Sequence, residues 1–511
     1  MTGTGFWANF RPRAGRGTGG PGTAGLAALM ALALAGPLSG CATNPATGER
    51  MMTFLSPEEE ARIGAREHRK LMPAFGGAIN DADLQRYVSS VGTLLARTSE
   101  LPKLRFTFTV LNTGMINAFA LPGGYVYITR GLLALANSEA EIAGVLAHEI
   151  GHVTARHAAQ RHSRSVFAGI GATAIGILTG SGDLARLTGS RLGSYLRGYS
   201  REQEFEADKL GIRYLKRAGF DPQAMADFLS SLRAHARLAA RLAGRSPSAV
   251  DQSNIMSTHP RTLERVARAA REAGGIQHPN PIVGRDVYLR KIGGMIYGDT
   301  PEQGFVRGRD FLHPDMRIRF RVPRGFHMIN QPSQVLAKGP DGMVIIFSAA
   351  SRAGRRSPYD YLVNVWAPNL RLTELDSSSI NGMPAAGGAA RVRSRRGITN
   401  LRLLAIRRGV RMYRFMFTGP GGSSQRLYDA YRETATSFRG VSPSVAQRWR
   451  PYRIRIVRVR RGDTVARLAR RMAVDRFAEE HFRVLNGLGP RDRLIPGRRV
   501  KIVTSGRRRG S

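Results

Sequence analysis

Apolar residues recur at helical spacing in some stretches of the chain and alternate with polar residues in others. Ser56-Pro57-Glu58-Glu59 has the residues of a helix start, and we expect helices over about 56–72 and 81–98. Alternation from Leu104 to Val110 predicts a strand, and Tyr125 to Thr129 is a second β-prone run. Pro122-Gly123-Gly124 beside that run favours a sheet edge, where an extended peptide can bind through main-chain hydrogen bonds.

A helix with a histidine pair is predicted next. Ser138 to Glu141 has the sequence of a capping box, and the apolar residues that follow recur at helical spacing. The helix contains His148-Glu149-Ile150-Gly151-His152. Four residues make slightly more than one turn, so both histidines project from one face and can share a metal ion, with Glu149 beside the open coordination position. The alternative is a pair of solvent-facing histidines, but the small and apolar residues around them favour a buried site.

A catalytic zinc ion needs a third protein ligand, which we expect from the acidic stretch 199–208. Glu204 and Asp208 are four residues apart and share a helix face. We assign Glu204 as the ligand, and Asp208 as the acceptor for the outer N–H of a ligand histidine. Glu149 would then accept a proton from the attacking water and pass it to the leaving amine. The alternative is a charged helix with internal ion pairs, such as Glu206 with Lys209.

These motifs resemble a known family. His148 to His152, Asn117-Ala118-Phe119-Ala120 and Glu204 to Asp208 are together similar to the gluzincin metallopeptidases of the BepA, LoiP and HtpX group, metallopeptidase family forty-eight. The resemblance covers about residues 50–275 and implies a zinc endopeptidase with one Zn²⁺ per chain. It also implies that His259, in Ser257-Thr258-His259-Pro260-Arg261, can approach the zinc as a regulatory fourth ligand. The competing interpretation of His259 is a surface residue that caps a helix beginning at Pro260.

Two stretches carry less information. Residues 166–180 are rich in Ala, Gly and Ile, which suits a packed helix hairpin and a mobile cover over the cleft equally well. After a linker at 279–281, residues 281–445 contain alternating runs such as Met316 to Val322 and a turn at Gly339 to Gly342. We expect a small α+β domain with an antiparallel sheet, of unknown role.

The C-terminal stretch 452–505 reads as strand, helix, helix, strand and resembles a LysM domain. That resemblance implies a groove for N-acetylglucosamine-containing glycans between two loops. On this sequence the loops supply Gly462, Asp463, Thr464, Leu494, Ile495 and Pro496. The alternative is a βααβ domain that does not bind glycan, because turn residues can persist for folding reasons alone.

The N-terminus has the pattern of a secretion signal, with a basic segment and then the apolar run 25–36. The run is too short to span a bilayer, which takes about 20 apolar residues. Leu38-Ser39-Gly40-Cys41 resembles a bacterial lipobox, so we expect Cys41, the one cysteine in the chain, to carry a lipid at the mature N-terminus. The following residues are not acidic, which favours the periplasmic face of the outer membrane. The alternative is a buried free cysteine.

The charge is strongly basic, with 78 Lys+Arg against 37 Asp+Glu and a formal net charge of +41. Such a surface attracts polyanions. A secreted chain rarely meets nucleic acid, so cell wall and anionic lipid headgroups are the better partners and we expect no nucleic-acid partner.

We therefore predict an α+β protein: a mainly helical gluzincin peptidase domain with a small mixed sheet, an antiparallel-sheet α+β domain and a βααβ LysM-like domain. The expected divisions are 1–40 signal peptide, 41–55 lipid-anchored linker, 56–280 peptidase, 281–445 unknown role and 452–505 glycan-binding. The expected substrates are misfolded or stalled envelope proteins. A peptidoglycan-directed peptide hydrolase and a non-proteolytic chaperone closed by His259 are the alternatives.

Overall fold

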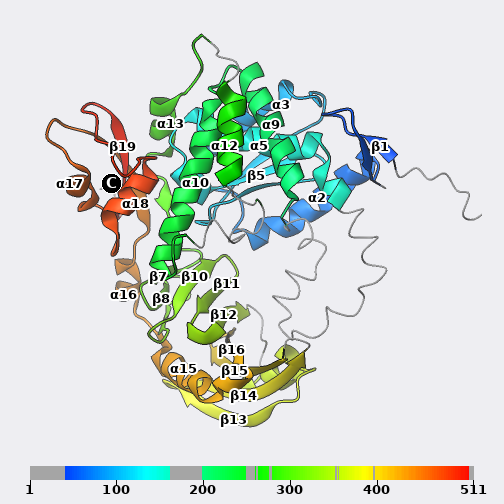
Figure 1. Cartoon of the computed structure of the whole chain (residues 1–511). Helices are drawn as coiled ribbons and strands as arrows, with labels where there is room; N and C mark the ends of the chain where they lie inside the picture. Colours follow the sequence, from blue (N-terminus) through cyan, green and yellow to red (C-terminus); the bar gives the residue numbers. More distant parts are fainter. Residues whose placement is uncertain are drawn as a thin grey trace, which may run out of the picture.

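The computed structural model describes residues 41–53, 55–161, 198–248, 259, 263–274, 279–350, 354, 356–394 and 397–505. The expectations for the signal segment and for residues 166–180 lie outside this part of the chain. The described residues form helices and sheets arranged as an α+β protein, as predicted (Figure 1). Among them, no helix is both long and apolar enough to cross a bilayer.

The first part of the fold is a mixed three-stranded sheet surrounded by helices. Its strand order is β3–β5–β4, with β3 (Thr107–Leu111) parallel and β4 (Ala118–Leu121) antiparallel to β5 (Tyr125–Thr129). The edge strand on this side is β4, which the sequence did not predict as a strand, whereas the predicted run Tyr125–Thr129 is the middle strand β5 and not an edge. The helices are α2 (Pro57–Ala74), α3 (Ala82–Arg97), α4 (Arg130–Leu135), α5 (Glu139–Thr154), α9 (Arg201–Arg217), α10 (Gln223–Leu242) and α12 (Leu263–Gly274).

Helix α5 is enclosed by the others because it is apolar on all sides: every residue from Ala140 to Thr154 is buried. The Ser138 hydroxyl accepts a hydrogen bond from the backbone of Glu141, as expected for the cap. The predicted capping box is wrong in one detail. The Glu141 carboxylate accepts from the backbone N–H of Asn137, one residue before the cap, at 2.9 Å. It thereby satisfies a buried donor of the preceding loop rather than the donor of Ser138.

Residues 41–53, which we expected to be a linker, pack against the helices that surround the three-stranded sheet. β1 (Cys41–Thr43) and β2 (Arg50–Met52) form an antiparallel hairpin. Asn44 in its turn is only 3% exposed, and its side chain bonds to Glu206 on α9. Arg213 of the same helix donates to the carbonyl of Ala46. Polar contacts with α9 therefore hold this segment in place. The sequence of the segment has no hydrophobic pattern that would have predicted this packing.

The predicted boundary at residue 281 does not coincide with a change of packing. Helix α13 (Arg285–Ile292) places Tyr288, Leu289 and Ile292 in the same hydrophobic core as Leu146 of α5. The next strand, β6 (Ile296–Tyr297), pairs with the C-terminal module. The chain turns to the central domain only after β6.

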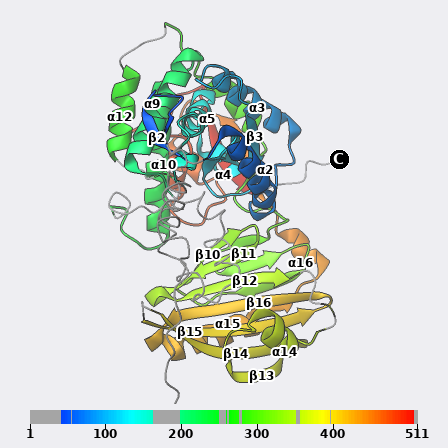
Figure 2. The same ribbon diagram turned by 90° about the vertical axis from the view of Figure 1, so that its right-hand side faces the viewer.

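The central domain contains a seven-stranded antiparallel sheet in the order β10–β11–β12–β16–β15–β14–β13, and a four-stranded sheet in the order β17–β9–β8–β7 (Figure 2). Along β15, Leu404 and Ile406 pack into one core and Leu403 and Ala405 into another, so the sheet is covered on both faces. The strands are β7 (Phe305–Arg307), β8 (Asp310–His313), β9 (Ile318–Arg321), β10 (His327–Gln331), β11 (Gln334–Lys338), β12 (Val344–Ala350), β13 (Thr373–Ile380), β14 (Met383–Ser394), β15 (Gly397–Arg408), β16 (Arg411–Pro420) and β17 (Arg439–Gly440), with helix α15 (Ser424–Ser437).

The C-terminal module has the predicted βααβ order: β18 (Tyr452–Arg458), α17 (Val465–Ala469), α18 (Ala478–Leu485) and β19 (Arg499–Ser505). It lies beside α10 and α13 (Figure 1). The contact includes the fully buried ammonium group of Lys501, which donates to the carbonyls of Ala134, Leu135 and Ala136 at 2.8, 3.0 and 2.6 Å. These carbonyls lie at the C-terminal end of α4, where the N–H groups of Lys501 satisfy unpaired acceptors, while burial lowers the pKa of Lys501 well below its ordinary value.

Candidate metal centre

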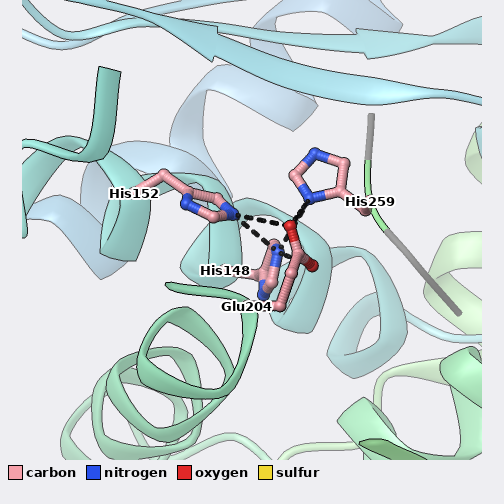
Figure 3. A group of neighbouring side chains, drawn as sticks. All are labelled: His148, His152, Glu204 and His259. Carbon is pink, nitrogen blue, oxygen red and sulfur yellow. Dashed lines mark hydrogen bonds and ion pairs between the residues drawn. The ribbon is translucent and has the colours of Figure 1, made fainter. Parts of the chain in front are cut away.

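Two closely packed helices bring the predicted ligand residues together. His148 and His152 extend from α5, and Glu204 extends from α9 (Figure 3). The helices approach closely because glycines lie at their contact. A Cβ atom on Gly151 would come within 3.1 Å of the Ala207 carbonyl oxygen, and one on Gly211 within 3.1 Å of the His148 backbone nitrogen. His259 completes the group, and one ligand atom from each of the four residues lies within 4.8 Å of the others.

The spacing of these atoms fits a tetrahedral metal ion. Zn²⁺ bonds of about 2.0–2.1 Å place tetrahedral ligands about 3.3–3.4 Å apart. His152 Nε2 lies 3.1 Å from His148 Nε2 and 3.6 Å from Glu204 Oε1. His259 Nδ1 lies 3.3 Å from His148 Nε2 and 2.8 Å from Glu204 Oε1. Three imidazoles and a carboxylate that face one another at this spacing, with little solvent access, form a donor set that can hold zinc.

Glu149 lies directly beside this group and is only 2% exposed. Its Oε1 atom is 3.3 Å from His259 Nε2, and its Oε2 atom is buried with no hydrogen-bond partner among the described residues. Burial raises the pKa of the Glu149 carboxyl above its ordinary value. A carboxylate with a raised pKa is suited to accept a proton and return it near neutral pH.

Asp208 and Arg265 support the ligands from behind. Asp208 Oδ1 lies 2.9 Å from His148 Nδ1, the position that we expected for it from the sequence. Arg265 of α12 donates to both Asp208 oxygens at 2.7 Å and lies 2.6 Å from Glu204 Oε2. Burial alone would raise the pKa of Asp208, but the charge and hydrogen bonds of Arg265 hold it well below its usual range. Sequence reasoning missed Arg265, which is 57 residues further along the chain than Asp208.

The ring of His152 is held from two sides by residues that sequence reasoning also missed. Tyr199 stacks on it with ring centroids 3.7 Å apart. His157 Nδ1 lies 2.8 Å from His152 Nδ1. α5 ends at Thr154, and Arg156 then adopts a left-handed conformation, φ 54°, that turns the chain back toward the site. A non-glycine residue in this conformation leaves no readable signal in one sequence.

A small apolar cavity of about 50 Å³ opens next to His148 and Glu149. It is smaller than the roughly 150 Å³ of a cavity that binds benzene, so it suits a small aliphatic group. Its apolar lining comes from β4, α4, α5 and α10, and comprises Ala118, Leu132, Val145, Met225, Phe228, Leu229 and Leu232.

The other predicted site residues lie far from this centre along the chain. Cys41 begins strand β1. Asp463 accepts from the backbone of Arg460, and Thr464 caps α17, so both have roles in the fold of the C-terminal module. The loop of Ile495, which is 57% exposed, joins the loop of residues 459–463 through backbone hydrogen bonds from Val459 to Arg498 and from Gly497 to Val459. The six residues predicted to bind glycan therefore lie on two adjacent loops.

Comparison with known proteins gives matches over the same part of the chain. Residues 82–273 match the model of Peptidase family M48, and this range contains His148, His152, Glu204 and His259. The Beta-barrel assembly-enhancing protease of Escherichia coli (strain K12) is 33% identical over 258 residues, which cover 49% of this chain and 51% of that protein. The protein of the same name from Yersinia pestis is 31% identical over 300 residues, covering 54% and 59%. Mitochondrial metalloendopeptidase OMA1 of Schizosaccharomyces pombe is 30% identical over 186 residues, covering 35% and 54%.

The chain thus spans about half the length of the curated relatives it matches. The family match and the donor set together support a zinc metallopeptidase centre in residues 82–273. The match ends before α13, so it does not extend to the central sheet or the C-terminal module.

Proposed function

We propose that this protein is a zinc-dependent metalloendopeptidase, with His148, His152 and Glu204 as ligands and Glu149 as general base. The observation that carries the proposal is the convergence of these four side chains from α5 and α9 in one buried site. The atom spacing matches a tetrahedral ion, and Glu149 lies beside it on the side of the apolar cavity.

The residues have distinct chemical tasks. A zinc ion bound there lowers the pKa of water and polarises the scissile carbonyl. Glu149 accepts the proton of the attacking water and delivers it to the leaving amine. Asp208 holds His148 through its outer nitrogen, and Arg265 holds Asp208 and Glu204. The apolar cavity accepts a small aliphatic side chain next to the scissile bond.

His259 regulates access to this chemistry. A catalytic zinc site keeps one position open, whereas a site with four protein ligands is closed. His259 Nδ1 takes the fourth position of the donor set, and its Nε2 atom faces Glu149. This arrangement corresponds to the closed form of the proposed switch, from which His259 moves away when a substrate binds.

The substrates are misassembled envelope proteins in the periplasm. The names of the bacterial relatives support this class of substrate, and the lipobox at Cys41 supports attachment to the inner leaflet of the outer membrane. β4 supplies an edge strand, and Ala118 on it lines the cavity, a placement that suits an extended polypeptide. The C-terminal module binds peptidoglycan through the two loops that carry Gly462, Asp463, Thr464, Leu494, Ile495 and Pro496.

Hydrolysis of casein and of purified peptidoglycan by the wild type, Glu149→Gln and His259→Ala tests these assignments. We expect the wild type to contain one zinc and cleave casein. Glu149→Gln keeps the zinc and loses turnover, and His259→Ala cleaves casein faster. Full casein cleavage by Glu149→Gln would refute the general base. Cleavage of peptidoglycan alone would favour a wall peptide hydrolase, and zinc binding without any hydrolysis would favour a closed chaperone.

Sedimentation with purified peptidoglycan tests the C-terminal module. The full chain should be retained, and Ile495→Asp should be released, because Ile495 is the most exposed apolar residue of the two loops. Equal retention of both proteins would show that the two loops do not carry the binding to peptidoglycan. If raised salt then releases both proteins, the binding is electrostatic; if it does not, another surface of the protein binds peptidoglycan.

A further inference from the structure

The outer nitrogen of His152 does not face a carboxylate directly; it faces a second histidine. His152 Nδ1 lies 2.8 Å from His157 Nδ1. His157 Nε2 lies 3.2 Å from Glu206 Oε2, and Asn44 donates to the other oxygen of Glu206 at 2.7 Å. A continuous chain of hydrogen bonds thus runs from the ligand group to the hairpin of residues 41–52.

With both imidazoles neutral, the donors and acceptors in this chain allow one arrangement of protons. Asn44 Oδ1 accepts from the backbone of Ala46, so its amide nitrogen faces Glu206 as a donor. The Glu206 carboxylate can only accept, and therefore His157 carries its proton on Nε2. His157 Nδ1 then offers a lone pair, which requires the proton of His152 on Nδ1. His152 Nε2 is left with the lone pair that a metal ion needs.

The two ends of this chain of hydrogen bonds are buried, the Glu206 side chain between them is 25% exposed, and none of its members supports the other histidine ligand. His157 is 0% exposed and Asn44 is 3% exposed. His148 has its own carboxylate in Asp208. Glu206 lies two residues from Glu204 on α9, and the sequence had suggested a pair with Lys209 for it. In the structure Glu206 is instead bonded to His157 and Asn44.

We propose that His157 and Glu206, with Asn44 behind them, are positioning residues that hold His152 in the tautomer and orientation required to bind zinc. This inference rests on the proposed function, because it concerns the same metal centre. Removing a partner of this kind typically weakens metal binding about 10–100-fold. The N-terminal hairpin then contributes to the metal site through Asn44, although it lies outside the matched range 82–273.

The test compares two substitutions at one position. His157→Leu removes both hydrogen bonds, whereas the amide of His157→Gln can accept from His152 and donate to Glu206. Zinc dissociation constants are measured on the full chain by competition with a chromophoric chelator, and the cobalt-substituted protein gives a visible spectrum. We expect zinc binding about 10–100-fold weaker and a changed cobalt spectrum for His157→Leu, and recovery to within about threefold of the wild type for His157→Gln.

Two further variants complete the experiment. His68→Leu is the matched control, because His68 bonds to Tyr127 in the same unit and has no part in the chain of hydrogen bonds. Its zinc affinity should equal that of the wild type. Asn44→Ala should weaken zinc binding in the same direction as His157→Leu but by less, because Glu206 then remains bonded to His157.

The outcomes are separable from those of the proposed function. Wild-type zinc affinity in a folded His157→Leu would overturn this inference and leave the proposed peptidase intact. Loss of affinity in His157→Gln equal to that in His157→Leu would show that packing, and not hydrogen bonding, matters at this position. A wild type that binds no zinc would refute the proposed function, and this inference with it.

Discussion

Arg265→Met tests the support of the site. Its side chain is 3% exposed, and the two carboxylates that it pairs, Asp208 and Glu204, are 7% and 0% exposed. Methionine preserves the aliphatic volume but removes the one arginine that pairs with both buried carboxylates, which then retain contacts with His148 and His259. Breaking a buried ion pair from one side costs about 3–5 kcal/mol, and we expect the free energy of local opening of α9 and α12 to fall by that amount.

Amide hydrogen exchange is the appropriate assay, because a chain with several domains does not unfold in one step and the exchange of single helices reports local opening. Arg271→Met is the control, because it changes the same residue type on the same helix at an exposed position. We expect it to change the free energy of local opening by less than about 0.5 kcal/mol. The decrease in the free energy of local opening caused by Arg265→Met should be larger after zinc has been removed with a chelator than in the zinc-bound protein. The reason is that a bound zinc ion also neutralises Glu204. Equal exchange in the two variants would refute the assignment of Arg265 as the counter-charge.

Three other measurements follow from the structure. Burial lowers the pKa of His481, beside Tyr297, to about 4, so its contribution to stability is complete above the ordinary pKa of about 6.5 and is lost as the pH falls toward 4; the free energies of local opening of α18 in the wild type and in His481→Phe, measured by amide exchange, should converge over that range by about 2–3 kcal/mol. Lys501→Met should speed amide exchange in β19 and at the end of α4, because three buried carbonyls lose a hydrogen-bond donor worth about 0.5–1.5 kcal/mol each. Leu229→Phe should fill the cavity and lower kcat/KM roughly tenfold for peptides with leucine next to the scissile bond, while peptides with glycine at that position are cleaved as by the wild type. An equal decrease in kcat/KM for both peptides would show that this cavity does not bind the substrate side chain.

The sequence predicted those parts of the site that depend on local periodicity. His148 and His152 share a face because they are one turn apart on α5. The same four-residue spacing predicted that Glu204 and Asp208 share a face of another helix, which is α9. The small mixed sheet, the antiparallel central domain and the βααβ module were also predicted from alternation and turn residues.

What the sequence could not show depends on contacts between distant segments. Arg265 reaches the site from a helix whose own pattern is only amphipathic, and His157 returns to it through the left-handed Arg156. Strands β13 and β14 were missed, since the first is almost wholly exposed and the second is rich in alanine and glycine, residues that are poor indicators of a strand. The hairpin around Asn44 is held by polar contacts, which leave no hydrophobic pattern.

The hairpin of residues 41–52 also limits how far the metal centre can move from Cys41. A flexible linker of 15 residues would let the active site range over roughly 20 Å, and over about 50 Å at full stretch. Only Ala42 and Thr43 lie between Cys41 and the buried Asn44, and three residue steps span about 10 Å in a strand. An acyl chain on Cys41 would therefore hold the peptidase body against the lipid surface in a restricted orientation. Its targets would be polypeptides that stall at the membrane itself, within a few nanometres of the bilayer, rather than those that diffuse through the periplasm.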